Sequence, residues 1–108
     1  MNWQEIIINA HLLVTDSVSH ARRLQSDRYF VWQEDGASDL MADNVRAGRT
    51  ISGTTDLFTK IEFDPWVKAL NASFDSNQYI YWELNSIQYE EDTGFYHYEW
   101  VWQVIYSG

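Results

Sequence analysis

The chain has 108 residues and a formal net charge of −9, and it contains no cysteine. This length predicts one α+β domain over residues 1–108 with a modest core. The absence of cysteine excludes disulfide frameworks, cysteine-zinc sites and thiol nucleophiles. The last basic residue is Lys68, and the small cluster of Arg22, Arg23 and Arg28 is outnumbered by sixteen acidic residues. We therefore expect no specific nucleic-acid binding, which needs a basic patch, and the lack of a long apolar run predicts no membrane span.

The first expected element is a helix over residues 3–25. Apolar residues recur there at three- and four-residue steps from Trp3 to Leu24, which is typical of an amphipathic helix. The segment Thr15–Ser17 contains weak helix formers and is the place where this helix would bend or break.

Two strands are expected before the second helix. Tyr29–Glu34 and Arg49–Ile61 are both rich in β-branched and aromatic residues, which favour strands. Gly53 lies inside the second of these segments and predicts a bulge or a close approach of two backbones.

Between these strands, residues 35–48 hold two glycines and show little hydrophobic periodicity. This composition predicts a long mobile loop, and loops of this length are often functional. The apolar residues of the loop are candidates for docking on a partner: Leu40, Met41 and Val45.

A second helix is expected to begin at Asp64-Pro65, because Asp favours the N-cap and Pro the first helical position. Its apolar stripe is expected to contain Phe63, Trp66, Val67, Leu70 and Phe74. The predicted order of elements is α-β-β-α-β-β, with a mostly antiparallel sheet packed by the two helices.

The last thirty residues predict an aromatic β-hairpin. Tyr79–Tyr89 and Phe95–Tyr106 both alternate apolar and polar residues, as strands with one buried face do. A three-residue turn that ends at Gly94 would place Glu91 opposite Phe95. In that register Ile80 faces Tyr106, Trp82 faces Val104, Leu84 faces Trp102, Ser86 faces Trp100, Ile87 faces Glu99 and Tyr89 faces His97.

This register divides the hairpin into a core face and an outward set. The expected core residues are Ile80, Trp82, Leu84, Trp100, Trp102 and Val104. The aromatic side chains off that face are candidates for an interface, since monomers seldom expose such patches without a use. Together with the acidic turn, the candidate interface residues of the hairpin are Tyr79, Tyr81, Tyr89, Glu90, Glu91, Asp92 and Phe95.

No catalytic or metal site is predicted. The three histidines, His11, His20 and His97, are scattered and are expected to be ordinary surface or half-buried side chains. The turn Glu90–Asp92 lacks the alternating oxygen ligands of a calcium loop. No nucleophile elbow or glycine-rich phosphate loop is present, so we expect no enzyme activity and no cofactor.

Several tracts resemble small proteins encoded in phage and prophage tail modules. These tracts are Gly53–Lys60, Glu62–Trp66, Trp82–Gly94 and His97–Trp102. The group is similar to the tail-terminator (tail-completion) proteins of long-tailed phages. The resemblance implies an α+β subunit that assembles into a ring, commonly a hexamer, which caps the tail-tube protein and meets the head–tail connector.

The resemblance therefore implies a virion component, assembled in the cytoplasm of a bacterial host, whose partners are its own copies, the tail tube and the connector. Two alternatives remain at this stage. One is a small acidic inhibitor that mimics DNA and blocks a host nuclease, which would need carboxylates arranged along one surface like phosphates. The other is a different virion adaptor with the same architecture.

Overall fold

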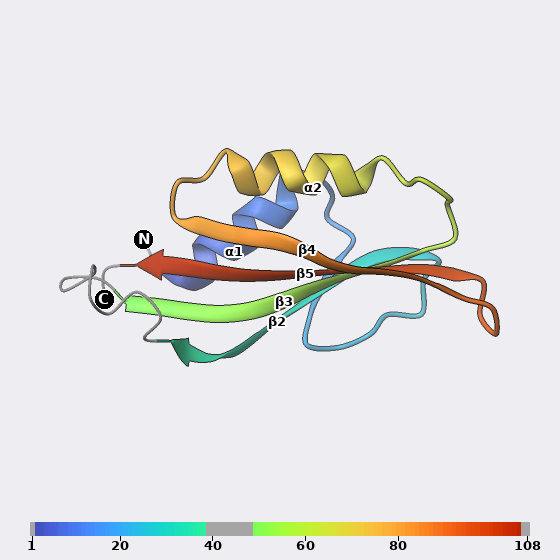
Figure 1. The fold of residues 1–108 in the computed structure, drawn as a ribbon, viewed down its shortest axis with the longest axis horizontal. Coiled ribbons are helices and arrows are strands. Elements are labelled where there is room, and N and C mark those ends of the chain that lie inside the picture. The colour runs from blue at the N-terminus through green and yellow to red at the C-terminus, as the bar shows by residue number, and fades with distance from the viewer. Residues whose placement is uncertain (1, 39–48, 107–108) are drawn as a thin grey trace.

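A five-stranded sheet with two helices on one of its faces forms the fold in the computed structural model, which describes residues 2–38 and 49–106 (Figure 1). The elements in chain order are α1 (Trp3–Leu12), β1 (Val18–His20), β2 (Arg28–Ser38), β3 (Arg49–Thr59), α2 (Trp66–Asp75), β4 (Ile80–Glu90) and β5 (Phe95–Tyr106). The strand order is β1-β2-β3-β5-β4, and all neighbours are antiparallel except β1 and β2. The prediction of an α+β fold with two helices and a mostly antiparallel sheet is confirmed.

The first helix is shorter than expected. The side chain of Asn2 accepts a hydrogen bond from the backbone N–H of Glu5 at 2.8 Å, which caps the start of α1. The helix ends at Leu12, before the weak helix formers Thr15–Ser17. The prediction of a helix over residues 3–25 is therefore wrong beyond Leu12, and the chain instead forms β1, a third strand before α2.

Strand β2 continues to Ser38, so residues 35–38 belong to a strand and not to the expected loop. A bulge between Glu34 and Gly36 lets the strand keep its pairing with β3 after one extra residue. The remainder of the expected loop, with Leu40, Met41 and Val45, lies outside the described residues.

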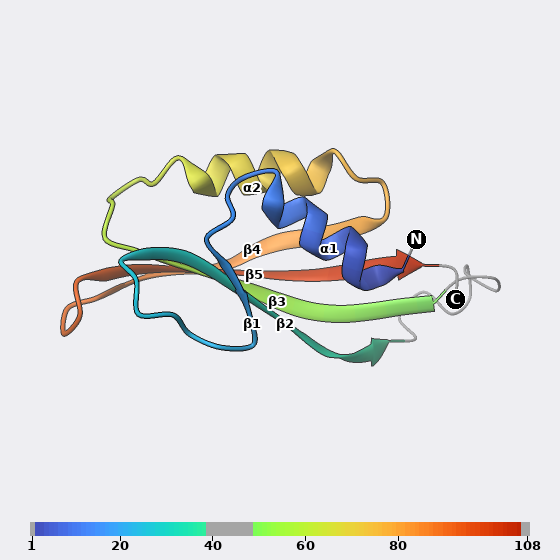
Figure 2. The same ribbon diagram turned by 180° about the vertical axis from the view of Figure 1, so that it is seen from behind.

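The main core lies between the helices and one face of the sheet, which we call the helix-covered face. Strands β2, β3 and β5 supply Phe30, Trp32, Leu57, Trp100 and Trp102, and the helices supply Ile7, Leu70 and Phe74. Figure 2 shows α1 and α2 together over this face. Apolar burial of this kind is the main stabilising contribution to a small domain.

Gly53 allows a close approach inside this core. A Cβ atom at Gly53 would overlap the ring of Trp102 and would lie 2.5 Å from the carbonyl oxygen of Gln33. The sequence predicted a bulge or a close approach at this glycine, and the close approach is confirmed.

A chain of hydrogen bonds crosses the same core. The N–H at Nδ1 of His11 donates to the carbonyl of Ile7 at 2.7 Å, since a carbonyl can only accept. The Nε2 atom of His11 therefore accepts from the Thr55 hydroxyl at 2.9 Å, and the Thr55 oxygen accepts from Trp102 Nε1 at 2.9 Å. His11 is fully buried, so the expectation of a surface or half-buried histidine is wrong at this position. Burial lowers the pKa of His11 to about 4 despite its backbone hydrogen bond.

The start of α2 is held by a buried carboxylate. Asp64 accepts the backbone N–H of Trp66 at 2.9 Å, but the N-cap is Pro65 and α2 begins at Trp66, one residue later than predicted. The same carboxylate accepts two hydrogen bonds from Arg28, at 2.6 and 2.8 Å, and one from Thr59 at 2.7 Å. Burial by itself would raise the pKa of Asp64, but these hydrogen bonds outweigh it and lower the pKa. Asp64 thus joins the first residue of β2, the last residue of β3 and α2.

The other side of the sheet is the open face. We call the end of the sheet at the turn of the β4–β5 hairpin the distal end. Near this end the open face carries a second cluster of Tyr29, Val31 and Phe58, with Phe95 against it. The segment between β1 and β2 covers this cluster, and the guanidinium carbon of Arg23 lies 4.0 Å from the centre of the Phe58 ring. The open face therefore has its own small core near the tip of the β4–β5 hairpin.

The register of the hairpin differs from the prediction. Glu90, and not Glu91, lies opposite Phe95, because the backbone N–H of Gly94 closes a longer turn on the carbonyl of Glu90 at 2.7 Å. A bulge between Leu84 and Ser86 then adds an unpaired residue, Asn85. The resulting pairs are Ile80–Val104, Trp82–Trp102, Leu84–Trp100, Ser86–Glu99, Ile87–Tyr98 and Tyr89–Tyr96.

The shift has different consequences on the two sides of the bulge. Before it, Ile80, Trp82 and Leu84 still share the helix-covered face with the expected β5 residues. After it, Ile87 and Tyr89 move to that same face, because their partners Tyr98 and Tyr96 belong to or pack against the main core. The expectation that Tyr89 lies off the core face is therefore wrong.

Candidate functional site

The outer edge of β4 is the first candidate for a contact surface. Strand β4 is last in the sheet and pairs only with β5 among the described residues. Eleven residues, Ile80–Glu90, therefore present one side of their backbone without a strand partner in that part of the chain. We call this side the β4 edge. A strand edge of this length is a template for pairing with another chain.

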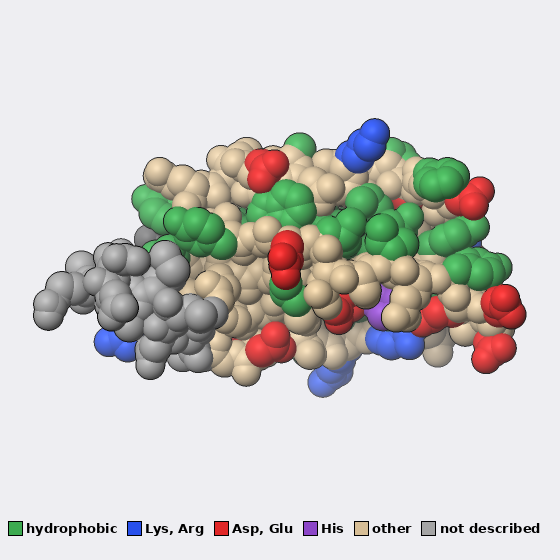
Figure 3. Space-filling view, in the orientation of Figure 1, with side chains coloured by type: hydrophobic (Ala, Val, Ile, Leu, Met, Phe, Trp, Pro, Cys, Tyr) green, Lys and Arg blue, Asp and Glu red, His purple; other side chains and the backbone are tan. Residues whose placement is uncertain are grey.

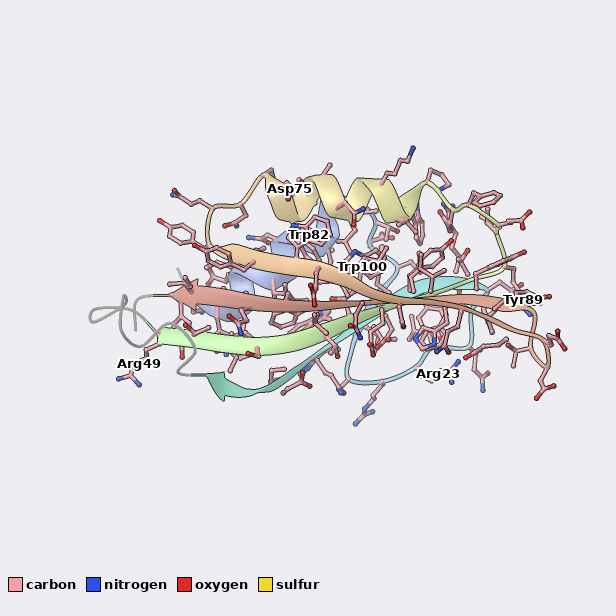
Figure 4. All side chains as sticks on the ribbon, viewed as in Figure 1. Arg23, Arg49, Asp75, Trp82, Tyr89 and Trp100 are labelled. Atoms are coloured by element: carbon pink, nitrogen blue, oxygen red, sulfur yellow. The ribbon has the colours of Figure 1, made fainter. Side chains whose placement is uncertain are left out.

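Large side chains flank the β4 edge at both ends. Tyr79 and Tyr81 lie at its start, with exposed fractions of 48% and 53%, and Tyr89 lies near its end with 54%. Figure 4 labels Tyr89 at the distal end of the hairpin, far along the strand from Trp82. All three tyrosines were expected to be candidates for an interface, and the structure brings them to one strand and the residue before it.

Tyr89 also belongs to a group of exposed apolar side chains at the distal end. Its members are Ile61, Phe63, Ile87 and Tyr89, which we call the distal patch; their exposed fractions run from 42% for Ile61 to 84% for Phe63. Tyr96 pairs with Thr59, two residues before Ile61, and the Tyr96 ring lies 4.8 Å from that of Tyr89. These contacts place the loop of Ile61 and Phe63 next to the hairpin. Burial, with the charge of Glu62, raises the pKa of Tyr96.

Phe63 corrects one sequence interpretation. It was expected in the apolar stripe of the second helix, yet it precedes α2 and is the most exposed large apolar side chain among the described residues. Its φ is 54°, in the left-handed region that a bulky side chain seldom adopts. Such backbone strain clusters at functional sites. No local pattern predicts this exposure, because Phe before Asp-Pro also fits a helix entry.

The space-filling view shows how these groups are arranged. Hydrophobic side chains follow the long axis of the molecule between α2 and the β4–β5 hairpin and gather again at the distal end (Figure 3). Within this row Trp82 is half-buried and donates a hydrogen bond from Nε1 to Asp75 at 2.8 Å. The row is thus anchored to α2 at one side and open along the β4 edge at the other.

The acidic turn is only partly available for contacts. Glu90 is half-buried and accepts from the hydroxyl of Thr93 at 3.1 Å, while Glu91 and Asp92 are exposed. Phe95 is half-buried because it packs against Phe58, so it belongs to the second core more than to a free surface. The ammonium of Lys60 lies 4.4 Å from the centre of the Phe95 ring.

His97 lies on the open face, opposite Gln88 and not opposite Tyr89 as predicted. Its Nε2 atom is 2.8 Å from Asp56, its Nδ1 atom is 3.6 Å from Glu90, and its ring stacks on Phe58. The hydrogen bond to Asp56 raises the pKa of His97 above its usual value, against the effect of burial. His97 is therefore a structural link between β3 and the hairpin. His20 is exposed and bonds Glu34 at 2.7 Å.

Among residues 2–38 and 49–106, no group of three or more His, Asp or Glu side chains is placed to hold a metal ion. No helix in that part of the chain is long and apolar enough to cross a membrane. The acidic side chains in Figure 3 are spread over the visible face and do not follow one line, so they give no support to a DNA mimic.

No protein-family model and no curated protein matches this chain. The candidate site therefore rests on geometry: an unpaired strand edge, three half-exposed tyrosines, the distal patch and an acidic turn.

Proposed function

We propose that this protein is a structural subunit of a long-tailed phage that forms a ring of identical copies, caps the tail tube and joins it to the head. The proposal assigns it no catalytic step. The observation that carries it is the β4 edge: an eleven-residue strand, one side of which pairs with no other strand in residues 2–38 and 49–106, with exposed tyrosines near both ends. Edges of this kind are normally shortened, charged or covered in monomeric proteins.

The composition of the surface supports an interface. Tyrosine and other aromatic side chains are enriched in protein–protein contacts, where they combine large apolar area with a hydrogen-bonding group. Tyr79, Tyr81 and Tyr89 fit this description. The formal charge of −9 agrees with a conduit for DNA, because acidic walls repel phosphates and would keep passing DNA from binding.

Two measurements test the proposal together. Light scattering over a range of concentrations should show an assembly of several copies, and co-sedimentation with assembled tail-tube protein from the same phage should show binding at the tube ends. Some ring proteins assemble only on their partner, so the second measurement covers that case. A chain that stays monomeric in both would contradict the proposal.

Substitutions at the β4 edge test the proposal directly, and substitutions at the end of α1 are the matched control. Tyr81→Ser with Tyr89→Ser should abolish assembly and tube binding, because both remove exposed aromatic area without touching the buried core. Leu12→Ser with Leu13→Ser removes exposed apolar area from the end of α1, with exposed fractions of 51% and 74%, and should leave both activities unchanged.

A further inference from the structure

The opposite edge of the sheet differs from the β4 edge in length and in charge. It is formed by β1, a strand of three residues parallel to β2. Between residues 17 and 28 the chain holds three arginines and one aspartate. Arg22 and Arg23 are exposed there, and Arg23 is labelled beside the hairpin in Figure 4.

The β4–β5 side carries the reverse charge. Residues 80–106 contain five acidic residues and neither lysine nor arginine. Glu90, Glu91 and Asp92 lie at the distal end of this side. Arg23 lies at the same end of the sheet, because it covers Phe58, which pairs with His97, which in turn pairs with Gln88. Because Arg23 packs on Phe58 of its own copy, the exposed side chain of Arg22, the next residue along the chain, is the charge that this end of the β1 edge offers to a neighbour.

The strand directions are complementary as well. Strands β2, β3, β5 and β4 alternate in direction, and β1 runs parallel to β2, so β4 and β1 run in opposite directions. A second copy placed beside the first in the same orientation would pair its β1 antiparallel to β4. Antiparallel pairing is the slightly more stable arrangement.

We infer that the partner of the β4 edge is the β1 edge of a second copy of this chain, so that the sheet continues from copy to copy head-to-tail. This inference rests on the proposed function and names the surface that the β4 edge meets. A head-to-tail contact uses two different surfaces, which is what a ring or a filament requires and a two-fold dimer does not.

The sheet also predicts which residues meet. Ser19 pairs with Val31, Val31 with Asp56, Asp56 with Glu99 and Glu99 with Ser86. Ser19 and Ser86 are thus level across the whole sheet and lie on the open face with Val31. In a continuous sheet without an offset, Ser86 of one copy lies beside Ser19 of the next.

The natural chain has no cysteine, so single thiols can report this contact. Ser19→Cys and Ser86→Cys are prepared in separate copies, mixed at high concentration and treated with a short bismaleimide. We expect the mixed cross-linked pair to exceed the products of either variant alone by at least about tenfold. Ser76→Cys, at the end of α2, is the control partner for Ser19→Cys and should give little product.

A second pair of variants tests the pairing without cross-linking. Ile87→Lys places a charge on the β4 edge, as natural proteins do to block edge pairing, and Arg22→Glu reverses the exposed charge beside β1. Each variant alone should lose assembly, whereas their mixture should form one-to-one pairs through the two intact edges. Lys68→Glu on α2 matches the charge change of Arg22→Glu and should assemble normally.

The outcomes separate this inference from the proposed function. A dominant Ser86→Cys homodimer, or normal assembly of both blocked variants, would overturn the head-to-tail pairing while the ring remains. If the wild-type protein assembles but the mixture of Ser19→Cys and Ser86→Cys gives no cross-linked pair, the head-to-tail pairing would be overturned in the same way. Wild-type protein that neither assembles nor binds the tube would overturn both.

Discussion

The core beneath the helices and the β4 edge differ in how completely their polar groups are paired and their apolar groups are buried. In the core, every buried side-chain nitrogen and oxygen among the described residues has a hydrogen-bond partner, and the buried apolar side chains are at most 8% exposed. Along the β4 edge, one side of the backbone lacks a strand partner, and three tyrosines and an isoleucine are about half exposed. The core maintains the fold, and in the proposed function the β4 edge is the surface that meets a partner. Substitutions in the two regions should therefore affect different measurements.

The largest effect is expected where the core holds a charge. Asp64→Ala would leave Arg28 without its counter-ion and would remove the acceptor of Thr59 and of the Trp66 N–H. We expect a loss of about 3–4 kcal/mol in the free energy of unfolding, measured by urea denaturation. His20→Ala is the control, because its exposed pair with Glu34 should contribute less than about 1 kcal/mol. Equal losses from the two variants would contradict the expectation that the buried carboxylate of Asp64 stabilises the fold more than an exposed ion pair does.

Gly53→Ala should be the next most damaging change. The added methyl group would overlap the ring of Trp102 and approach the carbonyl of Gln33, so the core would have to shift. Overpacking of this kind costs about 1–3 kcal/mol, which thermal unfolding would detect. Thr54→Ala, one residue along the same strand but half-buried, is the control. A Gly53→Ala protein as stable as Thr54→Ala would show that the close approach is not a constraint.

Burial of His11 should make the free energy of unfolding decrease as the pH falls. The folded pKa of His11 is about 4, and the unfolded value is near 6.5. Protons therefore bind the unfolded chain first as the pH falls below 6.5, and this destabilises the fold until the pH passes 4. The loss between pH 7 and pH 5 should be about 2 kcal/mol.

His97 must be removed from this measurement, because its pKa is raised by Asp56 and its contribution has the opposite sign. It stabilises the fold below the unfolded value and is lost as the pH rises through the folded value. Urea titrations in a His97→Gln background, with and without His11→Gln, should isolate the loss on acidification. A loss that persists in the double variant would assign it to other groups.

The smallest effect on stability is expected at the β4 edge. Tyr89→Ser should change the free energy of unfolding by less than about 0.5 kcal/mol, as exposed substitutions usually do, but should weaken association. Sizing and urea denaturation on the same sample would separate the two. A large loss of stability would mean that the edge supports the fold, and the contrast between core and edge would no longer hold.

Hydrophobic alternation was sufficient to predict the two strands of the hairpin and the residues that β4 and β5 bury before the bulge. It failed at Asn85, because a bulge inserts one residue without changing local composition. It also failed at β1, since three residues carry too little periodicity to stand out from a preceding helix.

The candidate site was predicted in part for the same physical reasons. Tyr79 and Tyr81 lie before the bulge and are exposed as expected, while Tyr89 changed face. Phe95 was expected to be outward, but its ring packs against Phe58 and lies beneath the ammonium of Lys60. Neither the exposure of Phe63 nor the free side of β4 is encoded locally, because both depend on which segments become neighbours in the sheet.

The bulge at Asn85 also separates two ways in which this surface can change over time. Point substitutions can alter the size or charge of Ile87 and Tyr89, but they leave both on the helix-covered side. Deletion of the single residue Asn85 would also leave both there, because Ser86 would then follow Leu84 directly and keep Glu99 as its partner, but the strand would lose the extra twist that the bulge adds. Exchanges of amino acids therefore alter the chemistry of this surface, whereas the loss of one residue at the bulge would alter the twist of the strand that carries it.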